Sequence, residues 1–205
     1  MKYAQPLAPD AVYHVFNHAV GTENLFREDE NYRYFLELAK NHLISICDLF
    51  AFALLPNHFH ILLKIHSEDI LIKNFELKYR KKIEFDELSK LISRQFSNMF
   101  NAYSKAYNKR FNRKGALFID YFRRKEIDNQ VYLKNIMHYI HYNPVLHELC
   151  NSVEEWEFTS YNIYISDKNT KLNKMILIDN FEGRQSFVNF NKKKPVIDNE
   201  EFGMY

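Results

Sequence analysis

Two histidines stand one residue apart in the apolar run LLPNHFHILLK, residues 54–64. In a β-strand, side chains alternate between the two faces, so His58 and His60 would share one face and Phe59 the other. Two residues of strand advance about 6.6 Å, which lets both imidazoles bind one divalent transition metal. Two structural histidines on a half-buried strand give the same pattern, and the run itself offers no third ligand. The pair therefore needs a partner from elsewhere in the chain.

A candidate partner is the segment MHYIHYNPV, residues 137–145. Tyr139 and Asn143 are four residues apart and so share one face of a helix. An asparagine carbonyl can complete the shell of a hard cation, and a phenol beside a metal-bound phosphate can act as a nucleophile. The alternative is a core tyrosine followed by a helix C-cap asparagine, and spacing alone favours that alternative.

Basic residues are concentrated between Asn101 and Gln130. This stretch holds eight Lys or Arg and three acidic residues, and the basic ones are Lys105, Lys109, Arg110, Arg113, Lys114, Arg123, Arg124 and Lys125. Interleaved with Tyr103, Tyr107 and Phe111, they could contact the phosphates and bases of a nucleic acid. A solvated helix face is equally basic, and Tyr103 and Tyr107 lie on an apolar stripe, so they could be core residues.

The hydrophobic patterns predict four strands and three helices in the order βαββαβα. The predicted strands cover 11–20, 49–55, 58–65 and 116–127, and the predicted helices begin near Arg27, at Phe85 and after Asp128-Asn129. Asn143-Pro144 is expected to end the last helix, because the residue before a proline avoids the helical region. Residues 67–84 are polar and are interpreted as an excursion from the core. This order predicts an α+β fold, with an antiparallel sheet and helices packed against it.

Composition predicts one intracellular domain with an appendage. The chain of 205 residues is 46% hydrophobic, with 18 Phe and 14 Tyr, which is enough to fill a sizeable core. The two cysteines match no metal or redox spacing, which fits a reducing cytoplasm. The longest apolar run, 49–55, is far shorter than the roughly 20 residues of a membrane span, and MKYAQPLAPD has no apolar core typical of a secretory signal. We expect a domain over 1–165 and a peripheral C-terminal extension over 166–205.

Five sequence blocks, taken together and in order, resemble the single-tyrosine transposases of the HUH class, above all the REP-associated tyrosine transposases. The blocks are YHVFNHAVGTENLFRED, LLPNHFHILLK, RKGALFIDYFRRKEI, YIHYNPV and WEFTSY. The resemblance implies a ferredoxin-like or RRM-like fold, one Mg²⁺ or Mn²⁺ bound by His58 and His60, and Asn143 as third ligand. It also implies that Tyr139 attacks a DNA phosphodiester.

The implied function is cleavage and rejoining of single-stranded DNA beside a hairpin or inverted repeat, through a 5′-phosphotyrosine bond. The DNA-binding residues would be Lys105, Lys109, Arg110, Arg113, Lys114, Arg123 and Arg124. One tyrosine makes one cut, so joining two ends suggests a homodimer. Arginine usually stands in the family where this chain has His18 and Tyr121, which affects substrate preference more than chemistry. Two alternatives stay open: a domesticated hairpin-binding protein that does not cleave, and a metal-dependent phosphoesterase that uses water.

Overall fold

The computed structural model describes residues 5–119, 121–167, 170–174, 178 and 180–195. Asp120 in the predicted fourth strand, and residues 168–169, 175–177, 179 and 196–205 of the predicted extension, lie outside the described residues. No helix in these described ranges is long and apolar enough to cross a membrane.

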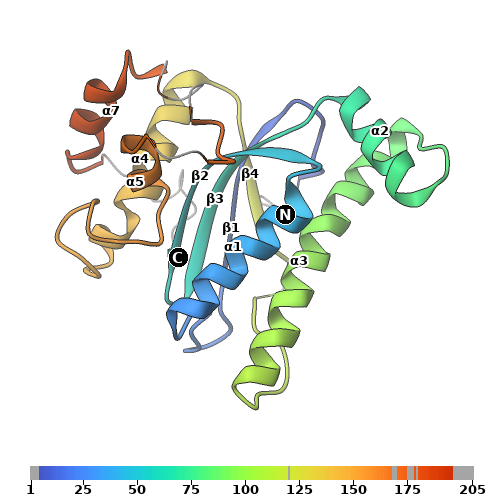
Figure 1. Ribbon diagram of the computed structural model, residues 1–205, viewed down its shortest axis with the longest axis horizontal. Helices are drawn as coiled ribbons and strands as arrows, with labels where there is room; N and C mark the ends of the chain where they lie inside the picture. The colour runs from blue at the N-terminus through green and yellow to red at the C-terminus, as the bar shows by residue number, and fades with distance from the viewer. Residues whose placement is uncertain (1–4, 120, 168–169, 175–177, 179, 196–205) are drawn as a thin grey trace.

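A four-stranded antiparallel sheet forms the centre of the fold (Figure 1). Its strands are β1 (Val12–His18), β2 (Cys47–Leu55), β3 (His58–Ile65) and β4 (Arg123–Ile127), in the spatial order β2-β3-β1-β4. In the register of β1 and β3, Phe16 lies opposite His60 and His18 lies opposite His58. Alternate side chains of the two central strands therefore share the histidine face of the sheet, defined as the face that carries His58 and His60.

Helices α1 (Asp29–Leu43) and α3 (Leu88–Arg110) cover the other face, which we call the aromatic face. Figure 1 shows them along the sheet, and they contact each other. Phenylalanine and tyrosine rings fill the space beneath them: Phe26, Phe35, Phe59, Phe96, Phe100 and Tyr103. A 3₁₀ turn, η1 (Phe85–Glu87), leads into α3. The apolar periodicity of both helices is thus explained by burial against one face of one sheet.

Helix α4 (Gln130–Leu146) lies on the histidine face, mainly against β2 and β3. Asn129 caps its first turn, because the Asn129 side chain accepts a hydrogen bond from the backbone N–H of Tyr132. A second core forms under α4 and includes Leu55, Leu62, Met137 and Ile140. Two short helices, α5 (Tyr161–Ile165) and α7 (Arg184–Asn191), complete this layer.

The α+β class and the antiparallel sheet are confirmed, whereas three local predictions were wrong. The polar segment 67–84, interpreted as an excursion from the core, contains a helix, α2 (Glu68–Tyr79), that packs into the core. Although most residues of the segment are polar, Leu71 and Phe75 are buried in the core of the aromatic face. One turn of apolar residues is enough to hold a helix whose other sides face water.

The fourth strand is shorter than predicted, covering 123–127 instead of 116–127. Tyr121 adopts a φ of 58°, a left-handed conformation that cannot continue a strand. Before it, only an isolated bridge between Ala19 and Phe118 continues the pairing among the described residues.

Pro144 does not end the last helix, which continues to Leu146. A proline inside a helix removes one hydrogen bond and costs about 3 kcal/mol. Asn143 and Pro144 are both buried under the second core, and this packing outweighs the local preference. Asn143 is consequently an interior helical residue, and His147 is the C-cap.

Part of the segment after residue 165 packs against α4. Phe181 and Phe187 belong to the second core, and the Asn191 side chain contacts His141 Nδ1 at 3.1 Å. The domain boundary at residue 165 stays a prediction, and the described part of the following segment contributes buried side chains to the domain.

Candidate active site

The four residues predicted to do chemistry come together where α4 crosses β3. His58 Nε2 lies 3.0 Å from Asn143 Oδ1. The ring of Tyr139 meets the ring of His60 edge-on, with centroids 5.3 Å apart. Tyr139 and Asn143 are one helical turn apart on α4, and both point toward the histidine face. The structure thus unites residues that are about 80 positions apart in the chain.

His58 is held between two asparagines. Its Nδ1 lies 2.8 Å from Asn57 Oδ1 and its Nε2 faces Asn143 Oδ1, so the single proton of the neutral imidazole can satisfy only one of these two acceptors. A metal-binding His58 carries that proton on Nδ1 and donates it to Asn57. Nε2 then keeps its lone pair toward Asn143 Oδ1. Two acceptor atoms 3.0 Å apart do not satisfy each other, but they are spaced as two neighbouring ligands of one cation would be.

His60 is buried and presents an unpartnered nitrogen to the site. Its Nδ1 contacts His14 Nε2 at 2.8 Å, and its Nε2 has no hydrogen-bond partner among the described residues. Burial, followed by the nearby His14, lowers the pKa of His60 well below its usual range. The imidazole is therefore neutral near pH 7, the form in which histidine binds metals.

His14 is a site residue that the sequence reasoning missed. It is fully buried on β1, and burial together with Lys125 lowers its pKa to about 3. Its Nδ1 is another buried atom without a partner among the described residues. The alternation of His14, Phe16 and His18 along the first strand was a usable signal, but the register of β1 on β3 was not readable from sequence.

Two more histidines flank His58 near the surface. The ring of His18 stacks on that of His58, with centroids 5.4 Å apart and planes 3° apart. The ring of His147, an exposed residue, is tilted against that of His58, with centroids 4.7 Å apart. Burial, followed by His147 and to a smaller extent His18, lowers the pKa of His58 to about 3, and the nearby Asn143 oxygen, which favours the protonated ring, acts in the opposite direction. His18, where arginine is usual in the resembled family, therefore lies directly beside the candidate site.

A small hollow gives access to this side of the site. It has a volume of about 240 Å³ and is lined by Asn24, Leu55, Pro56, Asn57, His58, His147 and Leu149. Of the predicted site residues, only His58 is on its wall, and His60, Tyr139 and Asn143 are not among its lining residues.

Tyr139 is 1% exposed and belongs to the second core. Burial raises the pKa of its phenol to about 12, and a hydrogen bond with Asn143 opposes that rise. Tyr139 is thus a core residue, as the alternative interpretation of its segment predicted. Its ring also lies next to the rings of His60 and His14. Tyr139 is protonated at neutral pH and in contact with the candidate ligands.

The side chains of the site offer few ligand atoms for one divalent cation: two imidazole nitrogens and one carbonyl oxygen. Among the residues that the structure describes, no three His, Cys, Asp or Glu side chains are arranged as a metal site. A cation here would need the Asn143 carbonyl beside two imidazoles. The buried, unpartnered Nε2 of His60 and the opposed acceptors of His58 and Asn143 are what such a cation would satisfy. Two imidazoles and one carbonyl oxygen suit Mn²⁺ better than Mg²⁺, which prefers oxygen ligands, and the remaining positions would be open for oxygen ligands.

The predicted DNA-binding residues divide into two groups. Lys105, Lys109 and Lys114 are exposed, and Arg123 lies on β4 opposite Phe16, toward the histidine face. For the other three, the protein partners are the following. Arg110 pairs with Glu28, Arg113 lies 3.4 Å from Glu23 and donates to the carbonyl of Ala116, and Arg124 donates to the carbonyl of Gln5.

Two of the three aromatic residues between these basic positions, Tyr103 and Tyr107, are not available for stacking on bases, whereas Phe111 is half-buried. Tyr103 and Tyr107 are buried, and their hydroxyls donate to the carbonyls of Leu25 and Asn24. These hydrogen bonds hold α3 against the segment that precedes α1. Tyr103 and Tyr107 are therefore core residues, as the alternative interpretation predicted.

One comparison with known proteins gives a match. No family model matches the chain, and no curated protein matches its sequence. Its structure is similar to that of a REP-associated tyrosine transposase bound to a REP hairpin, with a TM-score of 0.55 and 14% identity. The similarity covers 82% of this chain and 86% of that one. The two proteins share a fold. At this identity the likeness concerns architecture alone, and the chemistry must be argued from the site.

Proposed function

We propose that this protein cleaves and rejoins single-stranded DNA through Tyr139, in the manner of a transposase. The observation that carries the proposal is the buried cluster in which Tyr139, His60 and the opposed pair of His58 and Asn143 meet. The shared fold with a hairpin-bound tyrosine transposase supports it. The strand order β2-β3-β1-β4, with α1 and α3 on one face, supports the ferredoxin-like assignment of the 1–165 domain.

His58, His60 and Asn143 would hold one Mg²⁺ or Mn²⁺. When bound, the cation would draw negative charge from the non-bridging oxygens of the scissile phosphate. The protein keeps both imidazoles neutral by burying them, since burial disfavours the charged form.

His14 is a positioning residue for His60. In one tautomer, His60 Nδ1–H donates to His14 Nε2, and His60 Nε2 keeps a lone pair directed into the site. In the reverse tautomer, His60 Nε2 would carry a proton and could not act as a ligand. In the first tautomer, which leaves His60 able to bind a metal, the proton of the neutral His14 ring is on Nδ1. This atom has no described partner.

Tyr139 supplies the nucleophile. Its oxygen attacks the phosphorus, the bond from phosphorus to the 3′ oxygen breaks, and the phenolic proton ends on that oxygen as a free 3′-hydroxyl. The product is a 5′-phosphotyrosine ester. Because one ester replaces another, no ATP is needed, and a second 3′-hydroxyl can reverse the step.

The substrate would be single-stranded DNA next to a hairpin, met in the cytoplasm. Lys105, Lys109 and Lys114 would contact its phosphates, as would Arg110, Arg113, Arg123 and Arg124 once their contacts within the protein are exchanged for contacts with DNA. Two copies of the chain would be needed to join two ends, because each has one such tyrosine.

A covalent adduct tests the proposal. Purified protein, Mn²⁺ and an oligonucleotide carrying a hairpin and its single-stranded flank should give a species that survives denaturing electrophoresis. Tyr139→Phe removes only the attacking oxygen and should form no adduct while still binding DNA. Tyr142→Phe is the matched control, because the ring of Tyr142 contacts that of His138, whereas the ring of Tyr139 contacts those of His60 and His14.

Each outcome of this experiment decides between functions. An adduct in the Tyr139→Phe protein would place the nucleophile elsewhere. Cleavage without an adduct would instead favour a phosphoesterase that uses water, and hairpin binding without cleavage would favour a domesticated hairpin-binding protein.

A further inference from the structure

Helix α3 carries an unusual charge pattern for a surface helix. Its 23 residues include five basic side chains, Lys90, Arg94, Lys105, Lys109 and Arg110, and no Asp or Glu. Helix α1, which covers the same face of the sheet, has Asp29, Glu30 and Glu37 as well as basic residues. Solvated helices more often mix both signs of charge, so the composition of α3 suits an anionic partner.

Six of the eight exposed residues of α3 form one stripe. These are Lys90, Arg94, Ser97, Asn98, Asn101 and Lys105, and the other two, Lys109 and Arg110, follow at the end of the helix. At 100° per residue the six of the stripe fall within an arc of about 100°, and from first to last they extend over roughly 22 Å. We call this stripe the α3 outer face. Its side chains are cations and short hydrogen-bond donors, the types that most often contact the phosphates of nucleic acids.

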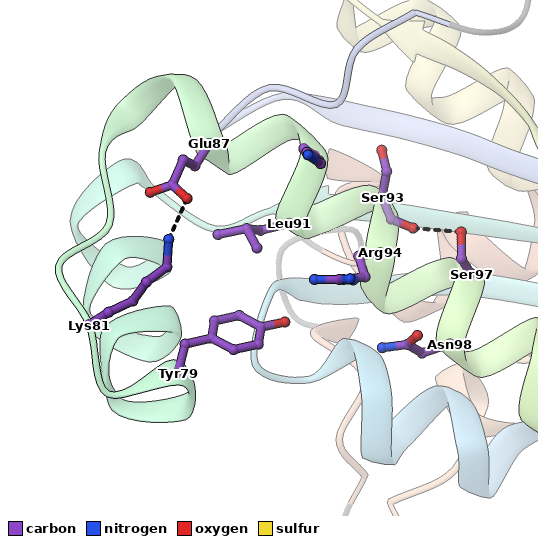
Figure 2. A pocket seen from close by; sticks show the side chains of 9 residues that line it. Tyr79, Lys81, Glu87, Leu91, Ser93, Arg94, Ser97 and Asn98 are labelled. Carbon is purple, nitrogen blue, oxygen red and sulfur yellow. Dashed lines mark hydrogen bonds and ion pairs between the residues drawn. The ribbon is translucent and has the colours of Figure 1, made fainter.

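Two hollows adjoin along the α3 outer face. The first has a volume of about 480 Å³, lies between α2 and α3, and has Tyr79, Lys81, Lys90 and Arg94 on its walls (Figure 2). The second is about 620 Å³ and is lined by residues that include Asn101, Ser104, Tyr121 and Arg124. Ser93 and Ser97 line both, so the hollows are neighbours along the helix.

The cations that line the first hollow differ in whether they form ion pairs within the protein. Lys81 forms an ion pair with Glu87, drawn as a dashed line in Figure 2. Lys90 and Arg94 form no ion pair with any residue that the structure describes. Figure 2 shows the Arg94 side chain lying across the hollow on the side of Tyr79. Lys90 is close enough to Glu87 to interact with its charge, but neither Lys90 nor Arg94 is tied up in a salt bridge with a described residue. Two such cations beside hydroxyl and amide groups are well suited to bind phosphates.

We infer that the α3 outer face binds the phosphate backbone of the duplex stem of a DNA hairpin, an assignment that rests on the proposed function. A stripe of roughly 22 Å matches the backbone of about six or seven base pairs. The stem site lies on the aromatic face of the sheet, and the cleavage site on the histidine face. The edge strand β4 connects them, since Arg124 lines the second hollow and Arg123 lies opposite Phe16 toward the histidines. The single strand leaving the stem would pass round this edge.

The test compares two double variants that each remove two positive charges. Lys90→Gln/Arg94→Gln alters the α3 outer face. The matched control is Lys40→Gln/Lys73→Gln, in which both lysines are exposed and Lys73 is about 200° round α2 from the buried Leu71. Binding of a hairpin oligonucleotide and of a hairpin-free single strand is measured by fluorescence anisotropy over a series of salt concentrations. Adduct formation is measured at saturating hairpin DNA.

The α3 variant should bind the hairpin more weakly, and the slope of log K against log salt should fall by about two, since two phosphate contacts are lost. Its binding of the hairpin-free strand and its adduct rate at saturation should match those of the parent. An unchanged hairpin slope, an equal loss in the control variant, or an equal loss for the hairpin-free strand would overturn the inference. If no protein forms an adduct, the proposed function fails, but the hairpin comparison still decides the stem site.

Discussion

The two faces of the sheet are built from different kinds of side chain. Under α1 and α3, the aromatic face holds phenylalanine rings and tyrosines whose hydroxyls find carbonyl partners, as Tyr103 does with Leu25. Under α4, the histidine face buries nitrogen atoms that have no described partner, on His14, His60 and Asn143. Each such atom costs about 1–3 kcal/mol when left unsatisfied. The aromatic face therefore supplies stability, and the histidine face uses some of it to hold a site.

Strand β3 separates these two roles within eight residues. Phe59 and Ile61 point into the core of the aromatic face, whereas His58 and His60 point toward α4. Because the side-chain period of a strand is two, a shift of one residue would exchange the core and the site. A change in the pairing register of the run LLPNHFHILLK would therefore disrupt both the core and the site.

The largest expected effect is on stability, from a change on the aromatic face. Phe35→Ala should lower the free energy of unfolding by about 3–5 kcal/mol, because the ring is fully buried among Phe26, Phe59 and Tyr103. Urea denaturation measures the loss, and the affinity of the folded protein for Mn²⁺ should stay unchanged. Tyr34→Ala, at the exposed neighbouring position, is the control. A cost below 1 kcal/mol for Phe35→Ala would show that this face is not the main source of stability.

For the histidine ligands, we expect a large effect on activity and metal binding and a small effect on stability. His58→Ala and His60→Ala should each abolish adduct formation and strongly weaken Mn²⁺ binding, measured by titration calorimetry. Each should cost only about 1–3 kcal/mol of stability, since a partly unsatisfied polar group is removed together with its packing. Cleavage at the parental rate by either variant would refute the metal assignment.

The smallest effect distinguishes positioning from ligation. His14→Phe keeps a ring beside Phe16 but cannot accept the proton of His60 Nδ1, so Mn²⁺ affinity should fall about 10- to 100-fold. His14→Gln offers an acceptor oxygen and should recover part of that loss. Nitrogen chemical shifts of the metal-free parent should show the His60 proton on Nδ1. Parental Mn²⁺ affinity in the His14→Phe protein, or a proton on Nε2, would exclude the positioning role.

Local sequence signals were enough to predict the class of fold. Alternating and continuous apolar runs marked the strands, and the period of 3.6 marked α1, α3 and α4, because these patterns follow directly from backbone geometry. The predictions that were wrong concern places where packing outweighs local preference. Pro144 remains inside α4 because its neighbours are buried, and α2 forms around Leu71 and Phe75 in an otherwise polar segment.

For the candidate site, the sequence by itself determined that His58 and His60 share a face of one strand and that Tyr139 and Asn143 share a face of one helix. Only the tertiary structure decided that these two faces meet, because the crossing of α4 over β3 depends on the whole second core. The register of β1 on β3 likewise decided that His14 contacts His60 and that His18 stacks on His58. Burial also decided that Tyr103 and Tyr107 are core residues, since exposure depends on what packs above a helix and not on the helix alone.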